Sequence, residues 1–355
     1  MTTTGTSSDL DPATPTAPAA PTRTEPAPLA YHRLAHLEPR TARWWRPVAT
    51  LGVATGLLLA LVAVLAVVLV VAVVASVVSP GLLADLAPVL RPLQPSVDLD
   101  DPRNPVDLLL GLGSIAVLLP VVVLAVRWGG GRRGTVHSVV GRFRWSLALR
   151  AAAVVLPAYA AVLWGLTAVA PPEDLSVPPL DAALVAVVVV ALLLTPLQCA
   201  AEEYVFRGLP QQLLGTWLRR PVWGVVLPVP LFVASHGYDW VGQVDVAVFA
   251  LATGFLVWKS GGLELAVVLH TAGNLPLFLA SPLSPGSLQQ GAVDPRALLV
   301  SLPLTLLTTG ALTLWVSRTH GVGLLEPVRG HGYAHAHPAT ETVPAVAGPA
   351  PDALA

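Results

Sequence analysis

The chain has 355 residues, of which 54% are hydrophobic and only 12% are charged, and its net charge is −1. Soluble domains carry about a quarter charged residues, so this composition excludes an ordinary soluble domain. No dense basic patch indicates nucleic acid, and we expect no nucleic-acid partner. The single cysteine, Cys199, excludes an intramolecular disulfide.

Two terminal segments differ from the rest of the chain. Residues 1–30 are rich in Thr, Pro and Ala and have few large apolar side chains, so we expect a disordered tail. Residues 321–355 are also rich in Pro and Ala, and we expect a second disordered tail that includes the histidines of "HGYAHAH". Residues 31–320 are then the membrane domain. No basic segment leads directly into a short apolar core, so we expect no cleaved signal peptide.

Apolar stretches of membrane-spanning length recur through the middle of the chain. About 20 residues of helix cross the hydrocarbon core, and a helix satisfies its own backbone hydrogen bonds in lipid. The sequence therefore predicts an all-α, polytopic membrane protein with about eight transmembrane helices. The predicted spans are 47–79, 106–126, 151–171, 182–206, 221–238, 244–258, 263–282 and 297–317.

Basic residues are distributed unevenly over the connections between these spans. Arginines precede the first span and fill the second connection, "RRGTVHSVVGRFRWSLALR", whereas the loops on the other side carry aspartates and few basic residues. Cytoplasmic loops carry the excess of Lys and Arg. We therefore expect a multi-pass protein of the cell membrane with both termini in the cytoplasm.

The stretch "CAAEEYVFRGLP" places Glu202, Glu203 and Arg207 at the end of an uncharged apolar run. Ionisable residues at membrane depth are costly and usually functional. Glu203 and Arg207 are four residues apart, so they share a helix face and can pair. Glu202 is rotated by about 100° around the helix and is free to face another group.

Further polar groups occur on two later spans. These are His236, in "PLFVASHGYDW", and His270 with Asn274, in "VVLHTAGNLP". If the fourth helix continues through "GLPQQLLGTW" and the chain turns at 219–220, Glu202 and His236 arrive at nearly the same height. We expect Glu202, His236, His270 and Asn274 to converge on one cavity that opens toward the cytoplasm.

Three motifs now resemble a known family. E-E-x-x-x-R at 202–207, F-x-x-x-H at 232–236 and H-x-x-x-N at 270–274 resemble, in this order, the CAAX-protease and bacteriocin-processing family, which includes the Ras-converting type II prenyl endopeptidases. The resemblance covers about 180–280, the family's four-helix core. It implies an intramembrane endopeptidase that acts on a membrane-associated protein or peptide.

The resemblance also implies roles for single residues. Glu202 would be the catalytic carboxylate and, with His236, would activate a water molecule. His270 and Asn274 would donate hydrogen bonds to the oxyanion. Supporting positions would be Glu203, Arg207 and Phe232.

Metal use is left open by these residues. Glu202, His236 and His270 are types that ligate Zn²⁺, with water in the remaining position, and they equally fit a metal-free glutamate mechanism. Cys199 lies one turn before Glu202, but nothing in the sequence indicates an activated thiol, so we interpret it as an apolar filler.

Other classes of protein use similar residues. The chain can be a non-proteolytic scaffold or a bacteriocin self-immunity protein with the same fold. It can also be a proton-coupled transporter, whose relays use intramembrane Glu and His. Internal repeat symmetry would favour a transporter, and none is visible. A damaged motif would favour a scaffold, and all three motifs are intact.

Overall fold

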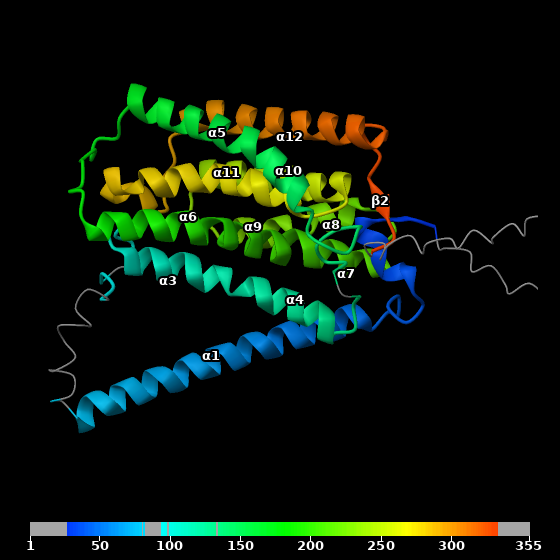
Figure 1. Ribbon diagram of the computed structural model, residues 1–355, viewed down its shortest axis with the longest axis horizontal. Helices are drawn as coiled ribbons and strands as arrows, with labels where there is room; N and C mark the ends of the chain where they lie inside the picture. Colours follow the sequence, from blue (N-terminus) through cyan, green and yellow to red (C-terminus); the bar gives the residue numbers. More distant parts are fainter. Residues whose placement is uncertain (1–26, 80, 82–93, 98, 133, 333–355) are drawn as a thin grey trace, which may run out of the picture.

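The computed structural model describes residues 27–79, 81, 94–97, 99–132 and 134–332. Long helices lie side by side along one axis, with short connections at the two ends (Figure 1). The longer helices are α1 Arg46–Val78, α3 Pro105–Ala116, α4 Leu118–Trp128, α5 Trp145–Val169, α6 Ala182–Glu203, α7 Leu209–Trp217, α10 Trp240–Ser260, α11 Glu264–Ala280 and α12 Leu298–His320. The shorter elements are β1 Leu29–Ala30, η1 Tyr31–Leu37, η3 Tyr204–Gly208, α8 Val222–Val226, α9 Val229–Ala234, η4 Ser281–Leu283, η5 Pro285–Leu288, η6 Pro295–Ala297 and β2 Arg329–Gly330.

Among the described residues, seven helical segments are long and apolar enough to cross a membrane. The prediction of an all-α polytopic membrane protein is confirmed, but the count of eight spans is not. The predicted span 221–238 forms two short helices, α8 and α9, separated by a turn. Pro228 and Pro230 remove two backbone donors at this point, which breaks the helix.

The predicted continuation of the fourth span is observed. Ala182–Trp217 is one apolar helical segment of 36 residues, in which η3 is a π-helical turn between α6 and α7. Pro210 follows this turn and cannot donate to the carbonyl four residues earlier, which favours the wider hydrogen-bond pattern. The π-turn begins directly after Glu203, so it sets the direction of the side chains that follow the two glutamates.

The two ends of the described chain meet. β1 and β2 pair antiparallel, with Leu29 opposite Gly330 and Ala30 opposite Arg329. The membrane domain therefore extends beyond the predicted borders at 30 and 320. The rest of the two predicted tails, 1–26 and 333–355, lies outside the described residues. The β1–β2 hydrogen bonds thus hold the two ends of the described chain side by side.

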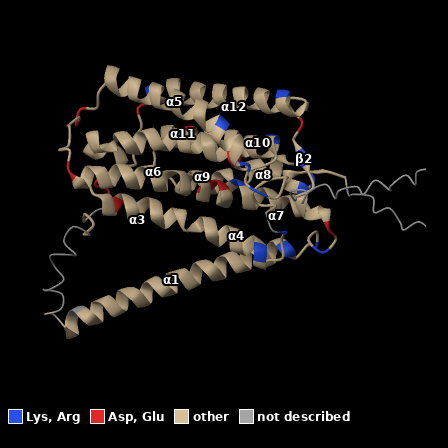
Figure 2. Cartoon of the chain, viewed as in Figure 1, with Lys and Arg blue, Asp and Glu red and all other residues tan. Residues whose placement is uncertain are grey.

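Charge separates the two ends of the helical bundle. In Figure 2, Lys and Arg gather at the end that carries α7 and β2, and the loops at the opposite end carry acidic residues. This distribution matches the pattern on which the predicted cytoplasmic location of both termini depends, and that location stays a prediction.

The core is centred on α11, which contacts α5, α6 and α10. In its most apolar window 61% of the residues are buried, against none in the corresponding window of α1. The preceding helix ends at Gly261, whose positive φ of 71° suits glycine. This tight connection places the start of α11 directly beside the end of α10, and α11 then runs past the glutamates of α6.

Candidate active site

Two neighbouring helices bring a histidine between the paired glutamates. His270 Nδ1 on α11 lies 2.8 Å from Glu203 Oε1, and His270 Nε2 lies 3.4 Å from Glu202 Oε2 on α6. Glu203 is fully buried, whereas 13% of the Glu202 side chain is exposed. The more accessible carboxylate is therefore the one that approaching water or substrate reaches first.

Arg207 compensates the buried charge of Glu203. Its Nη1 lies 3.2 Å from Glu203 Oε1, one helical turn away, and both side chains are almost completely buried. The guanidinium also lies over the Phe232 ring, 3.9 Å from its centroid, a cation–π arrangement. Pairing of Glu203 with Arg207, which the sequence predicts from their spacing, is present in the structure.

The hydrogen bonds of His270 constrain where one proton lies. An ionised carboxylate only accepts, so Nδ1 carries the proton donated to Glu203. Nε2 then faces Glu202, and two acceptors would face each other unless one of them is protonated. Glu202 Oε2 and His270 Nε2 lie 3.4 Å apart, so a proton bound by one of the two groups would be available to the other. Such a pair can take up and release a proton during a reaction.

Several polar atoms at this place are buried without a hydrogen-bond partner. They are Oε2 of Glu202, Oε2 of Glu203 and both Nη atoms of Arg207. Buried polar groups are nearly always hydrogen-bonded in folded proteins. A water molecule or a ligand at this point would supply the missing partners, and the cavity expected from the sequence stays a prediction.

His236 lies at the edge of this cluster. Its ring is tilted by 59° relative to the Phe232 ring, with 4.7 Å between the centroids, and the Phe232 centroid lies 6.3 Å from that of His270. His236 Nδ1 lies 2.8 Å from the carbonyl oxygen of Phe232, so this nitrogen donates and Nε2 is the acceptor in the neutral ring. Within the described residues, no hydrogen bond or ion pair joins His236 to Glu202.

Asn274 lies one turn beyond His270 on α11, beside Cys199. The Cys199 thiol has the side chains of Asn274 and Thr271 as polar neighbours and lies 3.3 Å from Gln198 Oε1. Asn274 is half-buried. The structure thus brings Glu202, Glu203, Arg207 and His270 into direct contact, and it places Phe232, His236 and Asn274 around them as a second layer.

The donor set does not fit a metal site as arranged. In the part of the chain that the structure describes, no group of three or more His, Cys, Asp and Glu side chains could hold a metal ion. Both ring nitrogens of His270 already face carboxylate oxygens. His236 keeps Nε2 free, because its hydrogen bond to the Phe232 carbonyl uses Nδ1, but within the described residues no contact joins it to the two glutamates.

Comparison with known proteins supports the family resemblance. Residues 181–276, from the cap of α6 to the middle of α11, match the family model described as type II CAAX prenyl endopeptidase, Rce1-like. This segment is therefore similar to the Rce1-like family. The matched segment contains all three motifs, and it supports a CAAX-type intramembrane protease fold.

A curated relative matches a segment of similar length. The uncharacterized protein YyaK of Bacillus subtilis (strain 168) is 29% identical over 93 residues, which are 24% of this chain and 31% of the relative. The chain therefore spans about a third of the length of that relative. No solved structure matches the chain.

Two polar contacts of the helical core were not predicted from the sequence. Glu264, at the start of α11, is fully buried and accepts two hydrogen bonds from the Arg144 guanidinium, at 2.9 Å and 2.7 Å. Tyr204, directly after the paired glutamates, forms a short hydrogen bond with His137. Both contacts fix the basic segment 129–144 to the core. The sequence feature that could have identified Glu264 is a single glutamate at the start of an apolar run.

Proposed function

We propose that this protein is an intramembrane endopeptidase that hydrolyses a peptide bond of a membrane-associated protein or peptide with a glutamate- and histidine-activated water molecule. The match of 181–276 to the Rce1-like family supports the protease class. The observation that carries the mechanism is the buried Oε2 atom of Glu202, which has no hydrogen-bond partner and lies 3.4 Å from His270 Nε2.

In this proposal, Glu202 is the general base. A water molecule beside its free carboxylate oxygen gives a proton to the Glu202–His270 pair as its oxygen attacks the scissile carbonyl carbon. The carbonyl oxygen takes the negative charge of the tetrahedral intermediate. The same pair then returns a proton to the leaving amine as the C–N bond breaks. Glu203 acts as a positioning residue, because it keeps the Nδ1 proton in place and turns Nε2 of His270 toward Glu202.

Oxyanion stabilisation is assigned to Asn274 and His236, with His270 as a further donor when its Nε2 is protonated. Asn274 follows His270 by one turn and carries amide donors toward the same part of α6. Donors in a dry site that are aimed at a developing oxyanion contribute about 3–4 kcal/mol each to the rate. His236 is close enough to share Phe232 with His270, and a modest movement of substrate or of the 235–239 loop brings it into use.

The proposed mechanism does not route a step through a metal. The arrangement of Glu202, His236 and His270 favours proton transfer within the cluster over ligation of Zn²⁺. Chelation tests this directly. A metal-free enzyme keeps its activity after treatment with 1,10-phenanthroline, whereas a Zn²⁺ enzyme loses activity and regains it when zinc is restored.

The experiment compares cells that produce the wild type with cells that produce Glu202→Gln. Quantitative mass spectrometry of new peptide termini in the membrane fraction identifies cleavage products. We expect a set of termini that is present with the wild type and absent with Glu202→Gln. Glu173→Gln is the matched control, because Glu173 is exposed in a loop far from the cluster in sequence, and it should behave like the wild type.

Two results would replace the proposed protease function with another function. If wild type and Glu202→Gln give identical termini at equal protein abundance, the non-proteolytic scaffold takes the place of the protease. If purified protein in vesicles moves protons or solutes in a Glu202-dependent way, the transporter interpretation replaces it. Among the described residues, we find no contact that favours the scaffold or the transporter over hydrolysis.

A further inference from the structure

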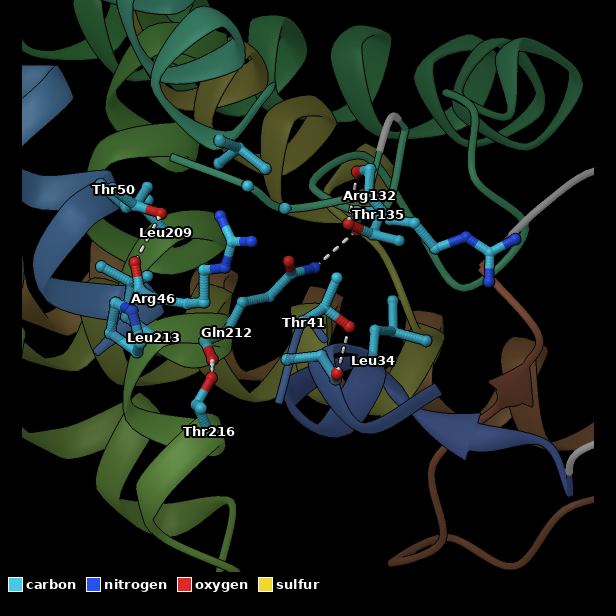
Figure 3. Close-up of a pocket in the computed structure, with 15 residues that line it drawn as sticks. Leu34, Thr41, Arg46, Thr50, Arg132, Thr135, Leu209, Gln212, Leu213 and Thr216 are labelled. Carbon is cyan, nitrogen blue, oxygen red and sulfur yellow. Dashed lines mark hydrogen bonds between the residues drawn. The ribbon is translucent and has the colours of Figure 1, made fainter. Parts of the chain in front are cut away.

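A pocket whose lining is mostly apolar lies at the end of the bundle that carries α7 and β2, and none of the residues of the glutamate cluster lines it (Figure 3). It is formed by η1, the start of α1, the glycine-rich loop after α4, and α7. Its volume of about 40 Å³ is room for roughly three water-sized groups. Its lining includes two arginines, Arg46 and Arg132, and no acidic residue.

Arg46 is the charged group that reaches into this pocket. Figure 3 shows its guanidinium between Thr50 and Gln212, whereas Arg132 runs outward toward the rim. Arg46 Nη1 lies 3.2 Å from the carbonyl oxygen of Gly129, and its Nε is buried without a hydrogen-bond partner. In the described part of the chain, no carboxylate forms an ion pair with Arg46.

The loop around Arg46 has a shape that only glycine permits. Gly130 has φ of +92°, and a Cβ built there would lie 1.6 Å from Arg46 Nη1. The backbone at 129–131 thus closes tightly over the guanidinium and fixes it in place. An arginine held in this way, with a buried donor left unused, is a preformed site for an anion.

The surroundings place this anion site at the membrane surface. Exposed tryptophans, typical of the interfacial region, surround it at Trp44, Trp128 and Trp217. The apolar part of the lining, which includes Val126 and Leu213, faces the same region. A soluble anion would have to approach through this apolar belt, whereas a lipid headgroup already lies there.

The helix that carries Arg46 leaves most of its apolar surface uncovered. Figure 1 shows α1 approaching α4 at its first turns and diverging from it along its length. Beyond Thr50, none of the α1 side chains whose burial the structure describes is buried. The acyl chains of a lipid whose headgroup is bound at Arg46 would therefore lie against the apolar side chains of α1.

We propose that this pocket binds the phosphate of an anionic glycerophospholipid, with Arg46 as its principal ligand. The charge of Arg46, its unused Nε donor, the small cavity with a mostly apolar lining and the uncovered apolar surface of α1 together fit a headgroup with attached chains. The bound lipid fills the space at the start of α1 and thereby fixes α1 to α4. This inference is independent of the proposed hydrolytic activity.

The test uses the full chain, purified in a neutral detergent and titrated with dioleoylphosphatidylglycerol or dioleoylphosphatidylcholine. Thermal unfolding and native mass spectrometry report stabilisation and retained lipid. We expect phosphatidylglycerol to raise the unfolding temperature and to remain bound, and phosphatidylcholine to do so much less. Arg46→Gln should weaken phosphatidylglycerol binding about tenfold or more, the loss typical of a charge-assisted hydrogen bond.

Matched variants distinguish lipid binding in this pocket from a general attraction by surface charge. Arg43→Gln removes an exposed arginine three residues away and should leave phosphatidylglycerol binding within about twofold of the wild type. Arg46→Lys keeps the charge without the fork of donors and should give an intermediate loss. If Arg46→Gln does not fold, the preference of the wild type for phosphatidylglycerol and the Arg46→Lys variant still test the proposal.

Three outcomes would overturn it. Equal stabilisation by phosphatidylcholine would show that no anionic headgroup is selected. An equal loss in Arg43→Gln and Arg46→Gln would assign the effect to surface charge. Inorganic phosphate or glycerophosphoglycerol that stabilises the protein as strongly as the lipid would make this a site for a soluble phosphate.

Discussion

His270 Nδ1 lies 2.8 Å from Glu203 Oε1, and this contact fixes which nitrogen of the ring faces Glu202. Of the two adjacent glutamates, the fully buried one is thus tied to the ring and to Arg207. The partly exposed one keeps a free oxygen. Adjacent residues of the same type therefore have different surroundings, and separate effects of mutation follow from this difference.

Glu202→Gln should abolish peptide hydrolysis while the fold is retained. The amide keeps the size of the side chain and can donate to His270 Nε2, so the contact between α6 and α11 persists. Loss of a general base lowers the rate about 10²- to 10⁴-fold. Product termini in cells report the activity, and the unfolding temperature in detergent reports the fold. A fully active Glu202→Gln enzyme would exclude Glu202 as the base.

Arg207→Ala should destabilise the protein strongly. It leaves the fully buried Glu203 without its counter-charge, and breaking a buried ion pair costs about 3–5 kcal/mol. We expect lower abundance in the membrane and a lower unfolding temperature. The matched comparison is Glu202→Gln, five residues away on the same helical segment, and equal destabilisation by both changes would contradict the separate roles.

The sequence was sufficient to predict the residues of this cluster, and for a physical reason. Charges are rare in apolar helices, so Glu202, Glu203, His270 and Arg207 stand out against their neighbours. Spacing by four residues then predicts which of them share a face. Which glutamate contacts His270 could not be predicted, because that depends on the rotation of α6 relative to α11 and on the π-turn that follows Glu203.

The sequence was less informative where the chain leaves regular structure. Hydropathy predicts one span at 221–238, but two prolines divide it into α8 and α9. Pairing of β1 with β2 involves only two residues on each side, and a signal of that length cannot be distinguished from a tail. Binding of Arg144 to Glu264 joins positions 120 residues apart, and no local pattern relates them.

Glu264→Gln should lower the stability of the membrane domain. Its carboxylate accepts hydrogen bonds from the backbone nitrogen, Nε and Nη2 of Arg144, and the remaining Arg144 charge would lose this partner. We expect a loss of about 3–5 kcal/mol, measured by chemical unfolding in detergent. Glu173→Gln, at an exposed position, should change the stability by no more than about 0.5 kcal/mol.

Reporter fusions should place the two ends of the bundle on opposite sides of the membrane. Position 140 lies in the basic segment that contacts the α10–α11 connection, and we expect it in the cytoplasm. Positions 175 and 290 lie in loops that approach each other through Ser176 and Leu283 and through Asp174 and Gly286; we expect both outside. A fusion at 90, outside the described residues, should also report the outside. Opposite signals at 175 and 290 would contradict the observed packing, and reversal of all signals would contradict the orientation.

The segment η1 should detach from α7 as the pH falls. His32 Nε2 contacts the carbonyl of Arg219 at 3.0 Å, and its Nδ1 is buried without a partner. Burial lowers the pKa of His32 below its ordinary value of about 6.5, and the nearby Arg33 charge lowers this pKa further. At pH values between the pKa of His32 in the folded state and its value of about 6.5 in the unfolded state, the unfolded state binds more protons. The stability that neutral, buried His32 contributes is therefore present above about pH 6.5 and is lost as the pH falls.

His32→Gln provides the matched control for this pH effect, because glutamine can still donate to the Arg219 carbonyl but does not titrate. The wild type should unfold at a temperature lower by a few degrees at pH 5.5 than at pH 7.5, and the variant should lose less. The burial of His36 lowers its pKa too, so a smaller dependence should persist in His32→Gln and disappear in the double variant His32→Gln/His36→Gln. The same pH dependence in wild type and double variant would assign the effect to groups outside η1.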